Sequence, residues 1–342
     1  MNLTQRLPTE YLILGCLALF PLGAYANAMG SQLTILLIFA ILALGLNVVV
    51  GNTGLLHLGI AAFFGLGAYV TGILTIGGYP FQVGFYAAAA ISTLVAAVAG
   101  LILGAPTLRL RGDYLALVTL GFGEVMRFSL RNLEEITGGT RGLNPVPPPW
   151  LPGMSPATFV TDYRPFFYIT LIILTVVVIF LRNLENSRTG RAWVAIREDE
   201  LAAACMGINV TRAKLAAFAV SAGLAGLAGC LYATKLSTTA DPNAYDFNRS
   251  IIILCCMILG GLGSIRGTLV GVLILIGFDT VLAPALDRYL QTLDINPTGA
   301  AYLTFSNWRL MIFGLALIVM MRLRPEGLLP SERVKLELHE AH

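Results

Sequence analysis

The chain has 342 residues, of which 56% are hydrophobic and only 12% carry a charged side chain. Soluble domains keep about a quarter of their residues charged, so this composition excludes an ordinary soluble domain and indicates a polytopic, all-α membrane protein. A net charge of +3 gives no indication of a nucleic-acid partner. The apolar runs are continuous rather than alternating, which argues against a membrane β-barrel.

Ten apolar runs approach the roughly 20 residues that a helix needs to cross a bilayer. We expect about ten transmembrane helices, some of them broken or re-entrant, at residues 11–30, 33–50, 57–77, 84–104, 113–131, 166–181, 214–233, 249–264, 267–286 and 308–321. The whole chain, 1–342, then forms one transmembrane domain. The first run resembles a cleavable signal peptide in its AYANA ending (24–28), but Glu10 and Pro21 favour a retained span.

Basic residues predict the orientation, because segments rich in Lys and Arg stay on the cytoplasmic side of a membrane. An even number of spans puts both termini on one side. If that side is the cytoplasm, the inner segments hold 14 Lys and Arg residues and the outer segments hold 8. We therefore expect cytoplasmic termini. The longest outer loop is then 132–165, whose NPVPPPWLPGMSP stretch (144–156) predicts an extended path.

Three polar residues within or beside the apolar runs are candidates for a translocation pathway. Glu124 and Arg127 are three residues apart, and therefore on one helix face, in LGFGEVMRF. Charged residues in a span usually face the bundle interior or a wet cavity, so the two form either a structural ion pair or part of a pathway. His57, in GLLHLG, is either a polar residue at a helix end or a third member of that site.

Glycines recur at four-residue spacing in GGLGSIRGTLVG, at Gly263, Gly267 and Gly271. This spacing predicts one helix face without side chains, along which a second helix packs closely. The alternative is a broken helix that lines a pathway.

Catalytic motifs are absent from the sequence. It contains no GxxxxGK[ST] phosphate loop, and GLGSIRG has one residue too many for a dinucleotide fingerprint. The three histidines, His57, His339 and His342, form no metal-binding spacing and no nucleophile–base pair. We expect no catalytic residue, no metal site and no cofactor, so the chain is not predicted to be an enzyme.

Charge gathers instead between two apolar runs, in SRTGRAWVAIREDELAAACMGIN (187–209), where 6 of 23 residues are charged. Strong helix formers predict one or two short helices within the connection 182–213, and Gly207 is well placed to end the last one. Apolar side chains beside a charged rim are typical of a helix that occupies a groove on a partner. The alternative is an amphipathic helix at the lipid surface.

Within this stretch we expect residues 192–207 to form the docking helix. The predicted rim and anchor residues of the docking surface, together with the residue that ends its helix, are Arg191, Trp193, Arg197, Glu198, Glu200, Leu201 and Gly207. Arg197, Glu198 and Glu200 would supply the charged rim, and either Trp193 or Leu201 the apolar anchor.

The same stretch resembles the cytoplasmic coupling loop of ABC importer permeases. Together with GNTGLLHLGIAAFFGLGAY (51–69), RLRGDYLALVTLGFGEVMR (109–127), TGGTRGL (137–143), GGLGSIRGTLVG (260–271) and RPEGLLP (324–330), it is similar to the branched-chain amino acid permease family, on the LivM-like side. The resemblance covers about residues 33–330. Leu201 stands where the general loop pattern has Glu, and His57 stands where the family usually has Ser.

The resemblance implies an ABC importer permease in a bacterial inner membrane. It implies a second, related permease subunit, two ATP-binding cassette subunits that dock on the coupling loop 182–213 and bind ATP and Mg, and a periplasmic binding protein that delivers substrate. The implied substrate is a branched-chain or other neutral amino acid. Urea or another small amide is the alternative within this machinery. An ion-coupled secondary transporter, using Glu124 and Asp279, is the alternative of another class.

Overall fold

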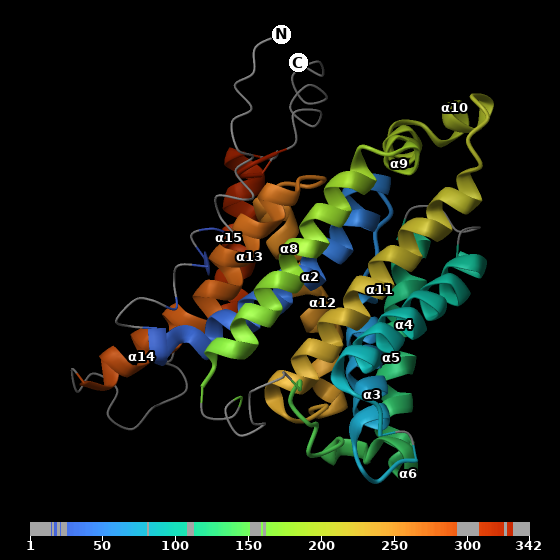
Figure 1. Ribbon diagram of the computed structural model, residues 1–342. Helices are drawn as coiled ribbons and strands as arrows, with labels where there is room; N and C mark the ends of the chain where they lie inside the picture. Colours follow the sequence, from blue (N-terminus) through green and yellow to red (C-terminus); the bar gives the residue numbers. More distant parts are fainter. Residues whose placement is uncertain are drawn as a thin grey trace.

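The computed structural model describes residues 26–80, 82–107, 113–150, 162–292, 308–324 and 327–330 with residues 15, 17, 18, 21 and 159, and in this part the regular secondary structure is helical (Figure 1). Among these described residues, five helices are long and apolar enough to cross a membrane: Met29–Thr53, Phe85–Thr107, Arg164–Glu185, Val210–Leu236 and Ile265–Tyr289. Three shorter helices are also apolar: Ile60–Thr75, Phe247–Gly260 and Leu310–Leu323. The predicted all-α membrane class is confirmed, whereas the count of ten spans stays a prediction.

The larger elements are α2 (Ala26–Thr53), α3 (Ile60–Thr75), α4 (Phe85–Thr107), α5 (Asp113–Asn132), α8 (Arg164–Glu185), α11 (Val210–Leu236), α12 (Phe247–Gly260), α13 (Ile265–Gly277), α14 (Ala283–Thr292) and α15 (Arg309–Leu323). The short elements are α6 (Glu134–Thr137), η2 (Gly139–Arg141), α9 (Arg188–Glu198), α10 (Glu200–Cys205), η3 (Pro242–Tyr245) and the π-helical turn η4 (Phe278–Leu282), which joins α13 to α14.

One predicted boundary is wrong. The expected spans 11–30 and 33–50 are separated at Ser31 and Gln32, but these two residues lie inside the continuous helix α2. Polar side chains do not interrupt the backbone hydrogen bonds of a helix, so two polar residues do not end it. The Thr34 hydroxyl, one turn later, donates to the Gly30 carbonyl of the same helix at 2.9 Å. The rest of the expected first span lies almost wholly outside the described residues.

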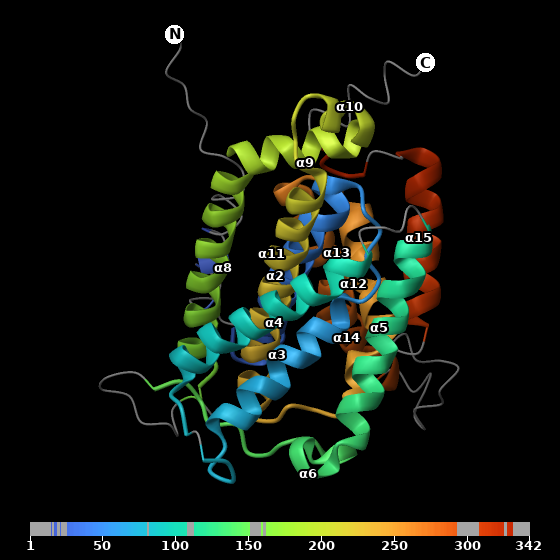
Figure 2. The same cartoon turned by 90° about the vertical axis from the view of Figure 1, so that its right-hand side faces the viewer.

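Helix α11 lies at the centre of the bundle and packs mainly against α2, α3 and α4 (Figures 1 and 2). Its small residues permit this. A Cβ atom at Gly226 would lie 2.8 Å from the Ser92 carbonyl oxygen of α4, and one at Gly229 would lie 2.8 Å from the Ala68 nitrogen of α3. Close backbone approach at small residues replaces the hydrophobic driving force that lipid does not supply.

Helices α12 and α13 form an antiparallel hairpin, and their backbones approach each other as closely as the glycine pattern predicts. A Cβ atom at Gly267 would lie 2.5 Å from the Gly260 carbonyl oxygen, and one at Gly271 would lie 3.0 Å from the Gly260 nitrogen. The placement of Gly263 on the same helix face is wrong, because this residue lies in the turn before α13 with φ +71°. That conformation costs glycine little and other residues more.

The two ends of the bundle differ. Helices α9 and α10 lie at one end and α6 at the other (Figure 2). Residues 327–330 lie at the α9 end, where the Leu329 N–H donates to the Gly260 carbonyl at 2.9 Å. At the α6 end, the described part of the Pro-rich segment packs on the end of α11 through the Val146 N–H and the Ser237 carbonyl, 2.9 Å apart. The helices of 182–213 and residues 327–330 therefore lie at one end of the bundle, and the cytoplasmic orientation of that end stays a prediction.

Candidate docking helices and a polar cluster on α5 and η3

The charged connection forms two helices, in agreement with the expectation of one or two short helices, whereas the single docking helix expected at 192–207 is divided between them. The Ser187 hydroxyl begins α9 by accepting the Gly190 N–H at 3.3 Å. Asp199 then takes an extended conformation, with φ −152° and ψ 112°, and begins α10 by accepting the Leu201 and Ala202 N–H groups at 2.8 and 3.0 Å. Asp is among the best helix N-caps, which explains why the helix restarts here.

Gly207 ends α10 as predicted. It has φ +85°, and the N–H groups of Gly207 and Ile208 donate to the carbonyls of Ala204 and Ala203 at 3.0 and 3.1 Å. This pair of bonds is the Schellman motif, which satisfies carbonyls that the last turn leaves unpaired.

The two predicted anchor residues differ in accessibility. Trp193 is only 1% exposed, and its Nε1–H donates to the Ala213 carbonyl of α11 at 2.7 Å, so it holds α9 to the bundle. Leu201 is 68% exposed and Met206 83% exposed, both at the outer surface of α10. The accessible apolar surface of this pair of helices is therefore on α10, at Leu201 and Met206.

The predicted charged residues of the docking surface also differ in exposure and in their contacts. Glu198 is exposed, as a rim residue should be. Glu200 binds Lys214 at 2.7 Å, which ties α10 to α11, and Arg191 donates to the nearby Asn186 carbonyl at 2.8 Å. Arg197 is half-buried and donates to the Gly51 carbonyl of α2, so its predicted rim position is wrong.

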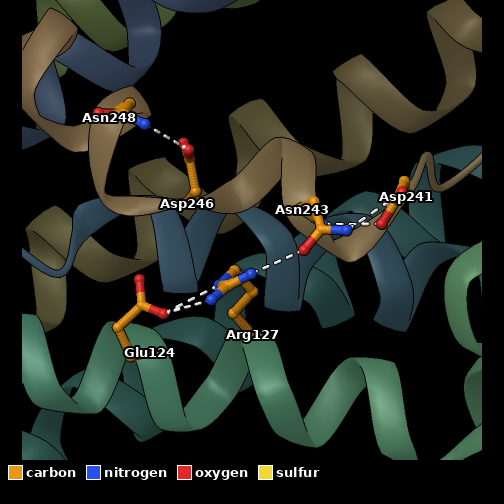
Figure 3. A network of polar contacts seen from close by, with 6 residues as sticks. All are labelled: Glu124, Arg127, Asp241, Asn243, Asp246 and Asn248. Carbon is orange, nitrogen blue, oxygen red and sulfur yellow. Dashed lines mark hydrogen bonds and ion pairs between the residues drawn. The ribbon is translucent and has the colours of Figure 1, made fainter.

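Glu124 and Arg127 form the predicted ion pair, within a larger polar cluster on α5 and η3 (Figure 3). The Arg127 Nε and Nη2 atoms donate to Glu124 Oε2 at 3.0 and 2.6 Å, and Nη1 donates to Asn243 Oδ1 at 2.7 Å. Asn243 in turn donates to Asp241 Oδ2 at 3.3 Å. One arginine therefore fastens α5 to the segment that leads into α12.

Sequence reasoning missed the η3 side of this cluster. Asp241 and Asp246 begin η3 and α12 by capping their first N–H groups, and Asn248 donates to Asp246 at 2.8 Å. The paired Asp-x-Asn spacing in DPN and DFN is a signal of such caps and could have indicated two helix starts. It could not have indicated that Asn243 meets Arg127.

His57 does not join the hydrogen-bonded cluster. It lies between α2 and α3, is 1% exposed, and packs against Phe63 and Phe218, with ring centroids 5.8 and 5.3 Å away. Asp279 lies in the π-helical turn η4. Among the residues that the structure describes, no group of three His, Cys, Asp or Glu side chains is placed to hold a metal ion.

We expect removal of Arg127 alone to cost more than removal of the whole pair. Arg127→Met leaves the partly buried Glu124 carboxylate without its partner, whereas Glu124→Leu with Arg127→Met leaves no charge behind. The double variant should therefore melt at a higher temperature in detergent than Arg127→Met alone, with a coupling energy of about 0.5–3 kcal/mol. Additive effects of the two substitutions would show that the pair does not stabilise the fold.

Apolar helices of membrane-spanning length, with a pair of short helices at one end, define the class: a multi-pass helical membrane protein. The chain belongs to the family of permease components of branched-chain amino acid transport systems, whose family model matches residues 28–321.

Individual relatives agree. The chain is 38% identical over 324 residues to the high-affinity branched-chain amino acid transport system permease protein LivM of Salmonella typhimurium, covering 89% of this chain and 71% of the relative. It is 37% identical to LivM of Escherichia coli over the same shares. It is also 28% identical to the permease protein LivH of Salmonella typhimurium, covering 74% of this chain and 83% of the relative. No solved structure matches the chain significantly.

Proposed function

We propose that this chain is a membrane-spanning permease subunit of an ATP-driven ABC importer for branched-chain amino acids or other neutral amino acids. The observation that carries the proposal is its 37–38% identity, over most of its length, to LivM permeases of branched-chain amino acid transport systems. The sequence has no phosphate loop, so ATP and Mg would be bound by separate subunits.

In this proposal α9 and α10 form the ATPase-coupling surface. The exposed apolar side chains Leu201 and Met206 would enter a cleft on the ATPase, and Glu198 would lie at its rim. Trp193 and the Glu200–Lys214 pair would hold the two helices rigidly on α11, so that a push on α10 reaches the bundle.

The proposed complex contains a second permease subunit and a periplasmic binding protein. The likeness to LivH supports a heterodimer of two related permeases. The cluster around Glu124 and Arg127 is our candidate for a polar contact with the zwitterionic substrate along the pathway. The alternative of ion-coupled transport has less support, because Glu124 is engaged by Arg127 rather than available to a coupling ion.

The test is transport by the complete complex in vesicles. The chain is co-expressed with its permease, ATPase and binding-protein partners, and uptake of L-leucine is measured with ATP on the ATPase side. We expect uptake to need ATP and to stop when the phosphate-loop lysine of the ATPase subunits is replaced by alanine. Uptake by this chain alone under a proton gradient would favour a secondary transporter, and uptake of urea in place of leucine would favour the small-amide alternative.

Orientation has its own test. The 14 to 8 distribution of basic residues predicts that the α9–α10 end and both termini face the cytoplasm. A reporter that is active only in the cytoplasm should be active when it is fused to the C-terminus, and a reporter that is active only in the periplasm should be silent there. The reverse pattern would contradict this orientation and would remove the coupling surface from the ATPase side.

A further inference from the structure

Arg197, on α9, meets two backbone segments from distant parts of the sequence, the end of α2 and the α12–α13 turn. Its guanidinium Nη1 donates to the Gly51 carbonyl in the last turn of α2. A Cβ atom at Gly54, just after α2, would lie 3.1 Å from Arg197 Cγ. A Cβ atom at Gly263, in the turn between α12 and α13, would lie 3.3 Å from Arg197 Nη1. The side chain therefore occupies a socket that Gly54 and Gly263 leave open, with the Gly51 carbonyl as its hydrogen-bond acceptor.

The socket suits a positively charged side chain, and a second hydrogen bond joins the two segments that form it. The Gly51 carbonyl is one of the last four backbone carbonyls of α2, which have no hydrogen-bond partner within the helix. A positive charge at a helix C-terminus is also favourable. Beside it, the Gly263 N–H donates to Asn47 Oδ1 at 3.0 Å, which joins the α12–α13 turn to α2. Gly54 and Gly263 both have φ +71°, so their conformations also favour glycine.

Helix α9 is thus held to the bundle at two points of different character. Trp193 fixes it to the first turn of α11 through the Ala213 carbonyl, and Arg197 fixes it to the end of α2 one turn later. The helix breaks immediately afterwards, at Asp199, and α10 carries the exposed surface. Arg197 therefore links the end of α9, next to α10, to α2 and to the α12–α13 turn.

The residues that follow Gly54 along the chain are hydrogen-bonded to α5 and α12. In the connection between α2 and α3, the Leu58 N–H donates to Thr119 Oγ1 of α5 at 3.0 Å. At the start of α3, the Ala61 N–H donates to Ser250 Oγ of α12 at 3.2 Å. Helix α5 carries Glu124 and Arg127, and α12 follows η3, so the connection beside Arg197 is bonded to α5 and the start of α3 is bonded to α12.

We propose that Arg197 is the positioning residue that transmits movement of the coupling helices to the α2–α3 connection and the α12–α13 turn, rather than a contact with the ATPase. The inference rests on the proposed function, since it needs an ATPase that moves α10. It predicts that Arg197 variants assemble with the ATPases normally but use ATP without moving substrate. A residue that only gripped the ATPase would lose assembly first.

The experiment measures ATP hydrolysed per L-leucine transported, and the amount of ATPase that co-purifies, for the complete complex with its binding protein in vesicles. The variants are Arg197→Gln and Arg197→Lys. Arg188→Gln is the matched control, because Arg188 lies on the same helix and its side chain is exposed. For Arg197→Gln we expect normal co-purification and about a fivefold or larger rise in ATP per leucine, the lower end of typical coupling effects. Arg197→Lys keeps a charge and a donor, so it should restore part of the coupling.

An unchanged ATP-to-leucine ratio in both Arg197 variants would overturn the inference. So would loss of ATPase co-purification in both. If Arg197→Gln fails to assemble while Arg197→Lys couples like the wild type, the residue has a structural role only and the inference also fails. Failure of the proposed function would look different, because the unmodified complex would then show no ATP-dependent leucine uptake.

Discussion

Leu201→Asp is expected to detach the ATPase subunits from the complex and to abolish ATP-driven uptake. Leu201 is 68% exposed on α10, so its side chain contributes little to folding and is available to a partner. Truncation of a buried interface anchor costs about 2 kcal/mol or more. Asp adds the cost of placing a carboxylate in an apolar cleft. The affinity of the ATPase should therefore fall about 30-fold or more, since every 1.4 kcal/mol is a factor of ten.

The measurement is co-purification of the ATPases together with ATP hydrolysis stimulated by the loaded binding protein. Leu201→Met is the matched control, because it conserves volume and apolarity and should retain both activities. Met206→Asp, on the same exposed surface, should weaken docking in the same direction. If Leu201→Asp leaves co-purification and stimulated hydrolysis intact, α10 is not the docking element and the charged connection is an ordinary solvated segment.

Gly267→Leu is expected to prevent the α12–α13 hairpin from closing. The first atom of the new side chain would already lie 2.5 Å from the Gly260 carbonyl oxygen and 2.8 Å from the Leu329 carbonyl oxygen. Both neighbours are backbone, so neither can turn away as a side chain would. Overpacking costs about 1–3 kcal/mol in ordinary cores, and a clash with backbone on two sides should exceed that range. We expect most of the folded, monodisperse protein to be lost in detergent.

The same helix supplies the control. A Cβ atom at Gly277 would meet only Leu36 Cδ1, at 3.6 Å, which is an ordinary contact. Gly277→Leu should therefore keep a near-native melting temperature and yield, and Gly267→Ala should fall between the two. Size-exclusion chromatography and thermal melting in detergent separate these outcomes. Equal yields for Gly267→Leu and Gly277→Leu would mean that the hairpin is not as closely packed as we describe.

Local chemistry determined much of this protein in advance. Continuous apolar runs predict membrane helices because hydropathy and length are properties of a single segment. The Glu124–Arg127 pair follows from three-residue spacing on one helix, and the left-handed end of α10 follows from the glycine at position 207. The absence of a phosphate loop is likewise a property of the sequence alone. Each of these features depends on residues within a few positions of one another.

Tertiary structure decided which side chains face a partner and which face the bundle. Trp193 and Leu201 are both apolar residues in one charged stretch, and only the position of α11 buries the first and leaves the second exposed. The sequence alone predicts Arg197 as a rim charge, whereas in the structure the C-terminal end of α2 and the α12–α13 turn both contact it. Burial and pairing across a hundred residues or more depend on how helices pack, and the pattern along one helix does not encode which neighbour it meets.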